Sequence, residues 1–437
     1  MIDVERLLKS TIPPHMLRQG LTILDSKLKP VKILFEQRRV PQEGLEDEAI
    51  AFLLALLSSM DTDKDPLAAR IGEREGRVAS KYIAQLAAGF NCGVGRSGQL
   101  VAAQPKAPGS SLMYYFANML ATDALRRFGL VNVKGAYVLP SATGIALALA
   151  LSTVQTKTGK REVVYLRADH RSPLKAIQLV GMQAQIVDGV VVGDAVRIPT
   201  EGVEEAVNEA TAAIVSTTTF FPPREPDDVK EIAKIAERLD VFHIINNAYG
   251  VQSREIMRRI RGAIDAGRVD AVIQSTDKNF LTPVGGSIVA SPNEEFLEGV
   301  SQSYPGRATA APIVQFLAAI LTLGVEGYQR LRDEQESNRR LLEELMCELA
   351  KKHGERVLET YSPIAVAMTL AKTNAKRIGH RLYTLRVTGP RVLEPTDFGV
   401  CCPRYPVPYI TMNAAIGCTP RDLELAVDRL DTLLATT

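Results

Sequence analysis

The stretch DAVIQSTDKNF, residues 270–280, decides the fold. It reads as a short buried strand, AVIQS, followed at once by the polar turn Thr276-Asp277-Lys278. Similar apolar runs recur upstream and downstream, and amphipathic helices separate several of them: AYVLP (136–140), VVYL (163–166), AQIVDGVVV (184–192), AAIVST (212–217), FHIIN (242–246) and GSIVAS (286–291). Continuous apolar strands that alternate with such helices predict an α/β fold, with a mostly parallel seven-stranded sheet and helices on both faces.

Changes of pattern divide the 437 residues into three regions. Residues 1–115 predict a helical N-terminal extension, in which the apolar stretch 44–60 packs against another helix or another subunit. Residues 116–305 form the large sheet domain. Residues 306–437 predict a smaller α+β domain, with a long charged helix over 327–354 and a final helix that begins near Pro420.

The composition excludes several classes of protein. Hydrophobic residues make up 46% of the chain, which is ordinary for a globular protein. No apolar run reaches about eighteen residues, so we expect no membrane-spanning helix. The first residues lack the apolar core of a signal peptide, which predicts a cytoplasmic protein. None of the five cysteines forms a CxxC pair, so we expect neither a disulfide framework nor a metal site. Cys401 and Cys402 are either a reactive pair or ordinary buried thiols.

The N-terminal segment is basic, although the net charge of the whole chain is only +2. Between Arg6 and Arg39 there are eight Lys or Arg residues and two Asp or Glu residues, and Lys32 and Arg38 are among the basic ones. Such a segment suits a nucleic-acid phosphate backbone, but a solvated helix face gives the same pattern. The charge alone leaves both interpretations open.

Three features in the middle region point to a cofactor. The turn VLPSATG opens a helix with hydroxyls and free N–H groups, which suits a phosphate group. The strand FHIIN ends in two amides, at the edge of a parallel sheet where ligands bind. Lys278 follows its strand directly, so its amine can reach the cavity, where desolvation and a cationic cofactor favour the neutral form that attacks an aldehyde. The residues concerned are Ser141, Ala142, Thr143, Gly144, Asn246, Asn247 and Lys278.

This ordered set resembles fold-type I pyridoxal-phosphate (PLP) enzymes, whose motif is a strand with Asp-x-Ala followed later by Ser-x-x-Lys. Here the motif reads Asn246-Asn247-Ala248 and Ser275-Thr276-Asp277-Lys278. The resemblance implies that Lys278 bonds to PLP and that an amide faces the pyridine nitrogen. Because an amide cannot hold that nitrogen as a charged pyridinium, we expect a weaker electron sink. That favours elimination or replacement over transamination.

A second group of basic residues lies upstream, in GEREGRVAS (72–80) and in the loop over residues 93–109. Glycines let a backbone wrap around an anion, and arginines bind phosphate through two parallel hydrogen bonds. SYPGRATAAP (303–312) adds Arg307, which follows Pro305 and Gly306 directly. A flexible surface linker is the alternative for the loop. The candidates for phosphate contact are Arg74, Arg77, Arg96, Gln104, Lys106 and Arg307.

The loop GVGRSGQLVAAQPKAPGSS together with GEREGRVAS, NNAYGVQS, STDKNF and YPGRA resembles the O-phosphoseryl-tRNA(Sec) selenium transferase family over nearly the whole chain. The resemblance implies conversion of O-phosphoseryl-tRNA(Sec) to selenocysteinyl-tRNA(Sec) with selenophosphate. Phosphate leaves by β-elimination, with Lys278 as candidate base, and selenium then adds to a dehydroalanyl group. It also implies that Ala142, Thr143 and Ser275 surround the PLP phosphate. The residues implied near the substrate phosphate are Arg74, Arg96, Ser97, Gln104 and Arg307.

The resemblance implies further contacts and an assembly. His170 would lie near the cofactor ring, although a structural histidine is an equal alternative. Arg391 would approach the acceptor end of the tRNA, and the basic segment with Lys32, Arg38 and Arg39 would grip its acceptor–TΨC arm. The resemblance also implies a homotetramer, built as a dimer of dimers, with active sites that form at the dimer interfaces.

Two other functions remain open from the sequence. One is a PLP-dependent phospholyase or desulfurase on a small amino acid, for which Cys401 or Cys402 would have to carry a persulfide. The other is a tRNA-binding scaffold without catalysis. A small-substrate enzyme does not need the basic N-terminus, and a desulfurase does not need the arginine-rich loop.

Overall fold

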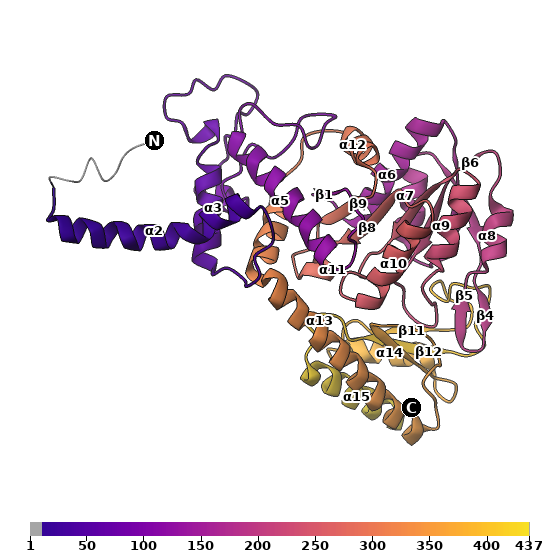
Figure 1. Cartoon of the computed structure of the whole chain (residues 1–437). Helices are drawn as coiled ribbons and strands as arrows, with labels where there is room; N and C mark the ends of the chain where they lie inside the picture. The colour runs from indigo at the N-terminus through magenta and orange to yellow at the C-terminus, as the bar shows by residue number, and fades with distance from the viewer. Residues whose placement is uncertain (1–10, 437) are drawn as a thin grey trace.

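A computed structural model describes residues 11–436 and places one large sheet at the centre of the chain (Figure 1). Its seven strands follow the order β1-β9-β8-β7-β6-β2-β3. Strands β8, β7, β6, β2 and β3 run parallel, whereas β9 is antiparallel to both of its neighbours. The predicted sheet is therefore confirmed. The bounds are β1 Gly135–Leu139, β2 Glu162–Leu166, β3 Gln183–Val187, β6 Thr211–Thr217, β7 Phe242–Asn246, β8 Ala271–Ser275 and β9 Ser287–Ser291.

Alternate residues of one strand enter different cores, which shows that both faces of the sheet are covered. Val163 and Tyr165 of β2 belong to the core that includes α6, while Val164 and Leu166 face a core with α8 and α9. Apolar side chains on both faces explain the continuous apolar runs in the sequence. The helices around the sheet are α6 Thr143–Thr158, α7 Arg171–Leu179, α8 Thr200–Ala206, α9 Val229–Arg238, α10 Arg254–Ala266, α11 Thr276–Phe280 and α12 Glu294–Gln302.

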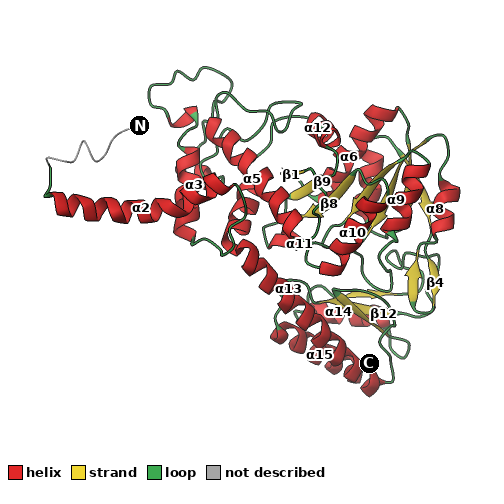
Figure 2. Cartoon of the chain, viewed as in Figure 1, coloured by secondary structure: helices red, strands yellow, loops and turns green. Residues whose placement is uncertain are grey.

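One predicted strand is two. The run 184–192 divides into β3 and β4 (Val190–Val192), and β4 leaves the large sheet to pair with β5 (Ala195–Arg197) in a separate hairpin (Figure 2). The sequence did not predict the three-residue strands β5 and β11 (Arg391–Leu393), because three residues are too few to show an alternating pattern.

The N-terminal region is helical, as predicted. It holds α2 (Pro14–Gln37), α3 (Asp47–Ser58), the 3₁₀ turn η1 (Thr62–Lys64), α4 (Lys81–Leu86) and α5 (Pro108–Arg127). Ile50, Leu53 and Leu57 of α3 are buried, and α3 packs on α5 and α13, so the apolar stretch 44–60 does meet other helices. Helix α2 extends away from the rest of the chain (Figure 1).

Helix α13 (Ala311–His353) runs from the large core into a smaller one. Its first half contributes Phe316 and Tyr328 to the large core, and its second half contributes Leu342 and Met346 to a separate core. The predicted domain boundary near residue 305 stays a prediction, since α13 belongs to both cores. The small core also takes β10 (Ala365–Thr369), β12 (Tyr409–Asn413), α14 (Ala375–Thr384) and α15 (Pro420–Ala435).

Helix α13 is interrupted at Gly324, whose backbone is not helical (φ 61°, ψ −174°). The segment before α3 fills the interruption. The N–H of Val325 donates to Pro41 O at 2.9 Å, and the N–H of Leu45 donates to Leu321 O at 2.8 Å. A Cβ on residue 324 would lie 2.6 Å from the backbone of Glu43, so the close approach requires glycine.

Among the described residues, α13 is the one helix long and apolar enough to cross a membrane, judged by length and composition. Half of its apolar window is buried inside the protein, as in the core helix of a globular domain. Its contacts with α5 and β1 account for that apolar surface.

Candidate active site

A cavity of about 370 Å³ lies where the ends of several strands meet. Residues from separate strand ends line it, as expected for an open α/β sheet. The structure thus brings Lys278 together with the turn that opens α6 and with the end of β7. The lining includes Thr143, Gly144, His170, Phe220, Phe221, Asn246, Tyr249, Gln252, Asp277, Lys278, Asn413 and Ile416.

The backbone that carries Lys278 is held firmly while its side chain is accessible in the cavity. Asn279 donates from Nδ2 to Ser275 O at 2.8 Å and to Ala248 O at 2.9 Å, which ties α11 to the segment after β7. Gln252 donates to the carbonyl of Lys278 at 3.3 Å. A fixed backbone with a free amine suits a covalent attachment point.

Ser275 has a different place from the one implied for it. Its side chain is buried at the end of β8, hydrogen-bonds to Asp277, and does not line the cavity in the described chain. Asp277 does line it. Ser275 is thus linked to the cavity by its hydrogen bond to Asp277, and its contact with the cofactor phosphate stays a prediction.

The turn Ser141–Gly144 offers a site for an anion. The hydroxyl of Ser141 is buried and has no hydrogen-bond partner in the described structure. Ala142 is the N-cap of α6 and provides no side-chain cap, so the first N–H groups of the helix are open to a ligand. Thr143 and Gly144 line the cavity, whereas Ala142 lines an adjoining groove with Ile145. An orphaned hydroxyl beside an uncapped helix start fits a bound phosphate group.

The two amides at the end of β7 diverge. Asn246 lines the cavity. Asn247 is fully buried on the other side of the strand, where its Oδ1 accepts from Thr218 at 2.7 Å and its Nδ2 faces Met257 and Gln274. Asn247 does not line the cavity of Lys278 in the described chain, and its contact with the cofactor stays a prediction.

His170 is the N-cap of α7 and lines the cavity. Its Nδ1 accepts from the N–H of Ser172 at 3.3 Å, which leaves Nε2 as the donor in a neutral ring. Desolvation, followed by the charges of Lys278 and Arg391, lowers the pKa of His170 and favours that neutral form. His170 can therefore donate a hydrogen bond into the cavity.

Arg391 reaches the cavity wall from the small core. Its guanidinium lies 4.5 Å from the ring centre of Phe221 and 5.6 Å from that of Phe220, and both rings line the cavity. Sequence analysis missed these phenylalanines and Tyr249. They follow β6 and β7, so the rule that ligands bind at the ends of parallel strands would have found them.

A second cavity, of about 720 Å³, holds part of the predicted phosphate site. Arg74, Lys106 and Arg307 line it, and none of them lines the cavity of Lys278 in this chain. Arg74 donates to Asn91 O at 3.3 Å, and Arg307 donates to Cys92 O. Nε of Arg307 is buried and, among residues 11–436, has no partner. The second cavity thus presents an unused donor.

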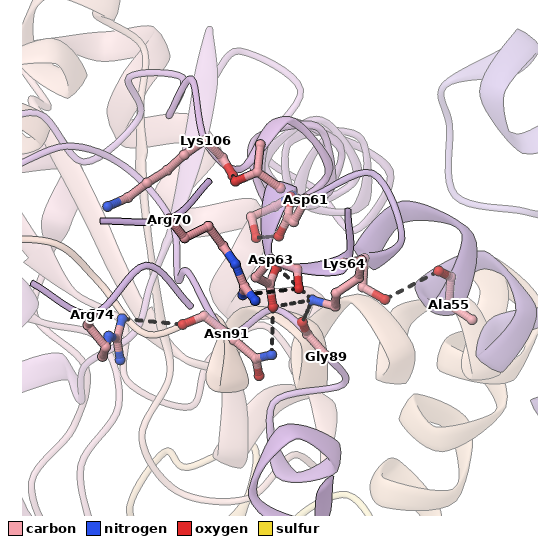
Figure 3. A network of polar contacts seen from close by, with 12 residues as sticks. Ala55, Asp61, Asp63, Lys64, Arg70, Arg74, Gly89, Asn91 and Lys106 are labelled. Carbon is pink, nitrogen blue, oxygen red and sulfur yellow. Dashed lines mark hydrogen bonds and ion pairs between the residues drawn. The ribbon is translucent and has the colours of Figure 1, made fainter. Parts of the chain in front are cut away.

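Figure 3 shows a polar network around Asp63, and Arg74, Asn91 and Lys106 in that view line the second cavity. Asp63 accepts from Asn91 Nδ2 at 2.8 Å and from Lys64 Nζ at 2.8 Å, and its backbone carbonyl accepts from Arg70 at 3.2 Å. Asp61 caps α5 by accepting from the N–H of Ser110 at 2.9 Å. Asp63 therefore joins the loop that carries Arg74 to the segment around Asn91.

The other predicted phosphate residues are not gathered with Lys278 either. Arg96 and Ser97 are exposed in a tight turn, in which the backbones of Arg96 and Gln99 pair at 2.9 Å. Gln104 is half-buried, and its N–H donates to Ser111 Oγ at 2.9 Å. Within one chain, therefore, the phosphate candidates and the lysine form two separate groups.

The basic residues at the end of α2 are exposed. Lys32, Arg38 and Arg39 make no ion pair with any described residue, and Arg38 has the left-handed conformation (φ 53°) that ends the helix. Arg6 and Lys9 lie outside the described residues. The exposed cations are free to meet a polyanion.

The cysteines are free thiols, and Cys401 and Cys402 are buried. Burial raises the pKa of Cys401 to about 12. Because the thiolate is the reactive form, neither thiol suits a persulfide carrier. In the part of the chain that the structure describes, no group of three or more His, Cys, Asp or Glu side chains is placed to hold a metal.

Comparisons with known proteins agree with this geometry. The sequence model of a family described as O-phosphoseryl-tRNA(Sec) selenium transferase matches residues 60–435. The protein of that name from Methanopyrus kandleri is 48% identical over 429 residues, which cover 97% of this chain and 99% of that protein. A crystal structure of an archaeal O-phosphoseryl-tRNA(Sec) selenium transferase has a TM-score of 0.95 at 42% identity and covers 99% of this chain and 100% of that one.

A more distant structure, Oryza sativa TDC with PLP and tryptamine, has a TM-score of 0.62 at 13% identity, covers 98% of this chain and 99% of that one, and shows a shared fold alone. Together with the sheet order, this likeness confirms the fold-type I expectation. Since the family match spans most of the chain, and the Methanopyrus kandleri protein is alike over nearly all of it, the chain belongs to the O-phosphoseryl-tRNA(Sec) selenium transferase family.

Proposed function

We propose that this chain uses PLP to convert O-phosphoseryl-tRNA(Sec) to selenocysteinyl-tRNA(Sec), with selenophosphate as the selenium donor. The observation that carries the proposal is the meeting of Lys278, Asn246 and the Thr143–Gly144 helix start in one cavity. Membership of the selenium transferase family supplies the substrate class. A purified protein that releases phosphate from phosphoseryl-tRNA(Sec) and incorporates selenium would support it; absence of both activities would favour the scaffold alternative.

The residues of the first cavity fit PLP. The uncapped start of α6 and the unpartnered Ser141 hydroxyl would hold its phosphate, and the Lys278 amine would hold its aldehyde carbon. Bound PLP would supply an electron sink that makes the α-proton of the phosphoseryl group acidic. Lys278 is then the group placed to take that proton, and Asn246 would face the pyridine nitrogen with an amide.

The phosphate candidates act, in this proposal, across a subunit interface. Within one chain they lie away from Lys278, and their neighbours are strongly exposed apolar residues such as Leu67 (92%), Ile71 (96%) and Leu86 (63%). Apolar surface of this kind marks an interface between chains. A homodimer that joins the second cavity of one subunit to the first cavity of its partner would complete two equal sites, and two dimers would form the tetramer.

The tRNA would be held by the basic end of α2 and by Arg391. Lys32, Arg38 and Arg39 are exposed and unpaired within residues 11–436, and Arg391 stands at the rim of the cavity. A protein that used free phosphoserine would have no role for that basic arm. Equal rates of phosphate release from free phosphoserine and from phosphoseryl-tRNA(Sec) would therefore favour the small-substrate alternative.

A further inference from the structure

A carboxylate stands among the cations of the second cavity. Glu75 accepts from Lys106 Nζ at 2.6 Å, and both residues line the cavity with Arg74 and Arg307. The bond to Lys106, followed by the charges of Lys106, Arg307 and Arg77, lowers the pKa of Glu75. Glu75 is therefore an anion held within a group of positive charges.

The backbone around Glu75 is shaped to keep the carboxylate there. Glu75 has a left-handed conformation (φ 52°), which is unusual for a residue other than glycine. Its carboxylate turns back over Gly72, where a Cβ would lie only 2.3 Å from Oε1. Gly72 thus leaves the space that the carboxylate fills.

One donor of the cavity remains unsatisfied while Glu75 is in place. Nε of Arg307 is buried and finds no acceptor among the described residues, although the guanidinium donates once to Cys92 O. One carboxylate pairs with Lys106 and leaves this donor open. A phosphate group has more negative charge and more acceptor oxygens, so it can bind both cations together.

We infer that Glu75 is an internal counter-anion, which neutralises Lys106 until a phosphoryl group displaces it from the cavity. The inference rests on the proposed function, which assigns this cavity to the substrate phosphate. Both side chains of the pair are partly exposed (32% and 20%), and exposed ion pairs are weak, so a phosphoryl dianion can replace the carboxylate. An unphosphorylated seryl group brings no charge and leaves the pair closed. Only a ligand that carries negative charge can therefore open the pair between Glu75 and Lys106.

Calorimetry with inorganic phosphate on the intact, PLP-loaded protein tests this inference. Glu75→Gln removes the competing anion, so the Kd for phosphate should fall about two- to fivefold, the range expected for an exposed ion pair. Glu209→Gln is the control, because Glu209 is exposed, does not line the second cavity, and makes no ion pair with a described residue. It should leave the Kd unchanged.

Gly72→Ala gives a second variant that keeps every charge. The added methyl group would collide with the movable carboxylate of Glu75, so the Kd should fall as it does for Glu75→Gln. Lys106→Gln should raise the Kd and should abolish the effect of Glu75→Gln in the double variant. A role of Glu75 in folding alone would change the urea midpoint without this pattern in phosphate affinity.

The outcomes separate the two claims. If phosphate affinity drops in Arg307→Ala but is equal in Glu75→Gln and Glu209→Gln, the counter-anion is wrong while the phosphate site stands. If Arg307→Ala binds phosphate as tightly as the wild type, the assignment of this cavity to phosphate fails, and the counter-anion fails with it.

Discussion

The carboxylate of Asp169 accepts a 2.8 Å hydrogen bond from the backbone N–H of Cys401. It also accepts from the N–H of Gly399 at 3.0 Å, and Cys401 Sγ in return accepts from the N–H of Asp169 at 3.2 Å. Asp169 precedes His170 of the cavity, and Cys401 lies in the C-terminal part of the chain. The cavity wall is therefore bonded directly to the C-terminal region.

Asp169→Ala should lower the free energy of unfolding by about 2–4 kcal/mol, because two buried N–H groups lose their acceptor. Urea denaturation measures the loss. Asp169 also pairs with Arg167 at 2.8 Å. Asp188→Ala is the control, since Asp188 pairs with Arg167 too, at 2.6 Å, but is 51% exposed; its cost should stay below about 1 kcal/mol. Equal losses in the two variants would show that the bond to Cys401 adds nothing.

Lys278→Ala should abolish turnover and the visible absorption of bound PLP, while tRNA binding is retained. The reason is that the amine is the attachment point in the cavity, whereas the basic arm lies elsewhere in the chain. Absorption spectra and a gel-shift assay make the two measurements. Lys175→Ala is a suitable control, because Lys175 is exposed on α7 and outside the cavity. Retained turnover in Lys278→Ala would refute the assignment.

Mixing two inactive variants should restore activity if the site is shared. Lys278→Ala and Arg307→Ala fail in different cavities, so a mixed dimer has one intact site, and random exchange should recover roughly a quarter of wild-type activity. Phosphate release after denaturation and joint refolding measures the recovery. No recovery, in a mixture shown by mass spectrometry to contain mixed dimers, would place both residues in one subunit's site.

Asn246→Asp should increase transamination side products during turnover, because a carboxylate can pair with a protonated pyridine nitrogen. Mass spectrometry of the released cofactor detects the amine form. Asn247→Asp should behave differently: it introduces a charge into the fully buried bonds to Thr218 and Gln274 and should destabilise the fold by about 3 kcal/mol or more. Unchanged side products in Asn246→Asp would contradict the account of the pyridine partner.

His243 should make the protein less stable in mild acid. Its Nε2 lies 2.8 Å from Ser216 Oγ, and burial lowers its pKa from 6.5 to about 4. Between pH 4 and pH 6.5 the unfolded chain binds a proton on His243 that the folded chain does not bind. The contribution of His243 to the free energy of unfolding is therefore complete above pH 6.5 and is lost as the pH falls toward 4. The wild type should lose about 3 kcal/mol more than His243→Gln between pH 7 and 4. If the free energies of unfolding of the wild type and His243→Gln, measured with urea, changed equally with pH, His243 would not be the cause.

The strands and the lysine could be predicted because their signals are local. A continuous apolar strand followed by a polar turn places Lys278 at the sheet edge whatever the rest of the chain does. The choice between Asn246 and Asn247 could not be made, since the strand phase at its last residue depends on packing against Met257 and Gln274. The sequence also could not predict that Lys278 and the phosphate candidates line separate cavities, because that depends on how α5, α13 and the N-terminal loops pack.

The interruption at Gly324 makes residues 41–46 a support for helix α13, whose second half carries the small core. The N–H groups that the break releases from α13 find their acceptors at Pro41 and Gln42. In a chain shortened past residue 46, α13 would have to straighten, or those N–H groups would have no acceptor. Either change would move the second half of α13 and the small core that packs on it. Loss of residues 41–46 would thus displace Arg391 relative to Phe220 and Phe221, far from the residues removed.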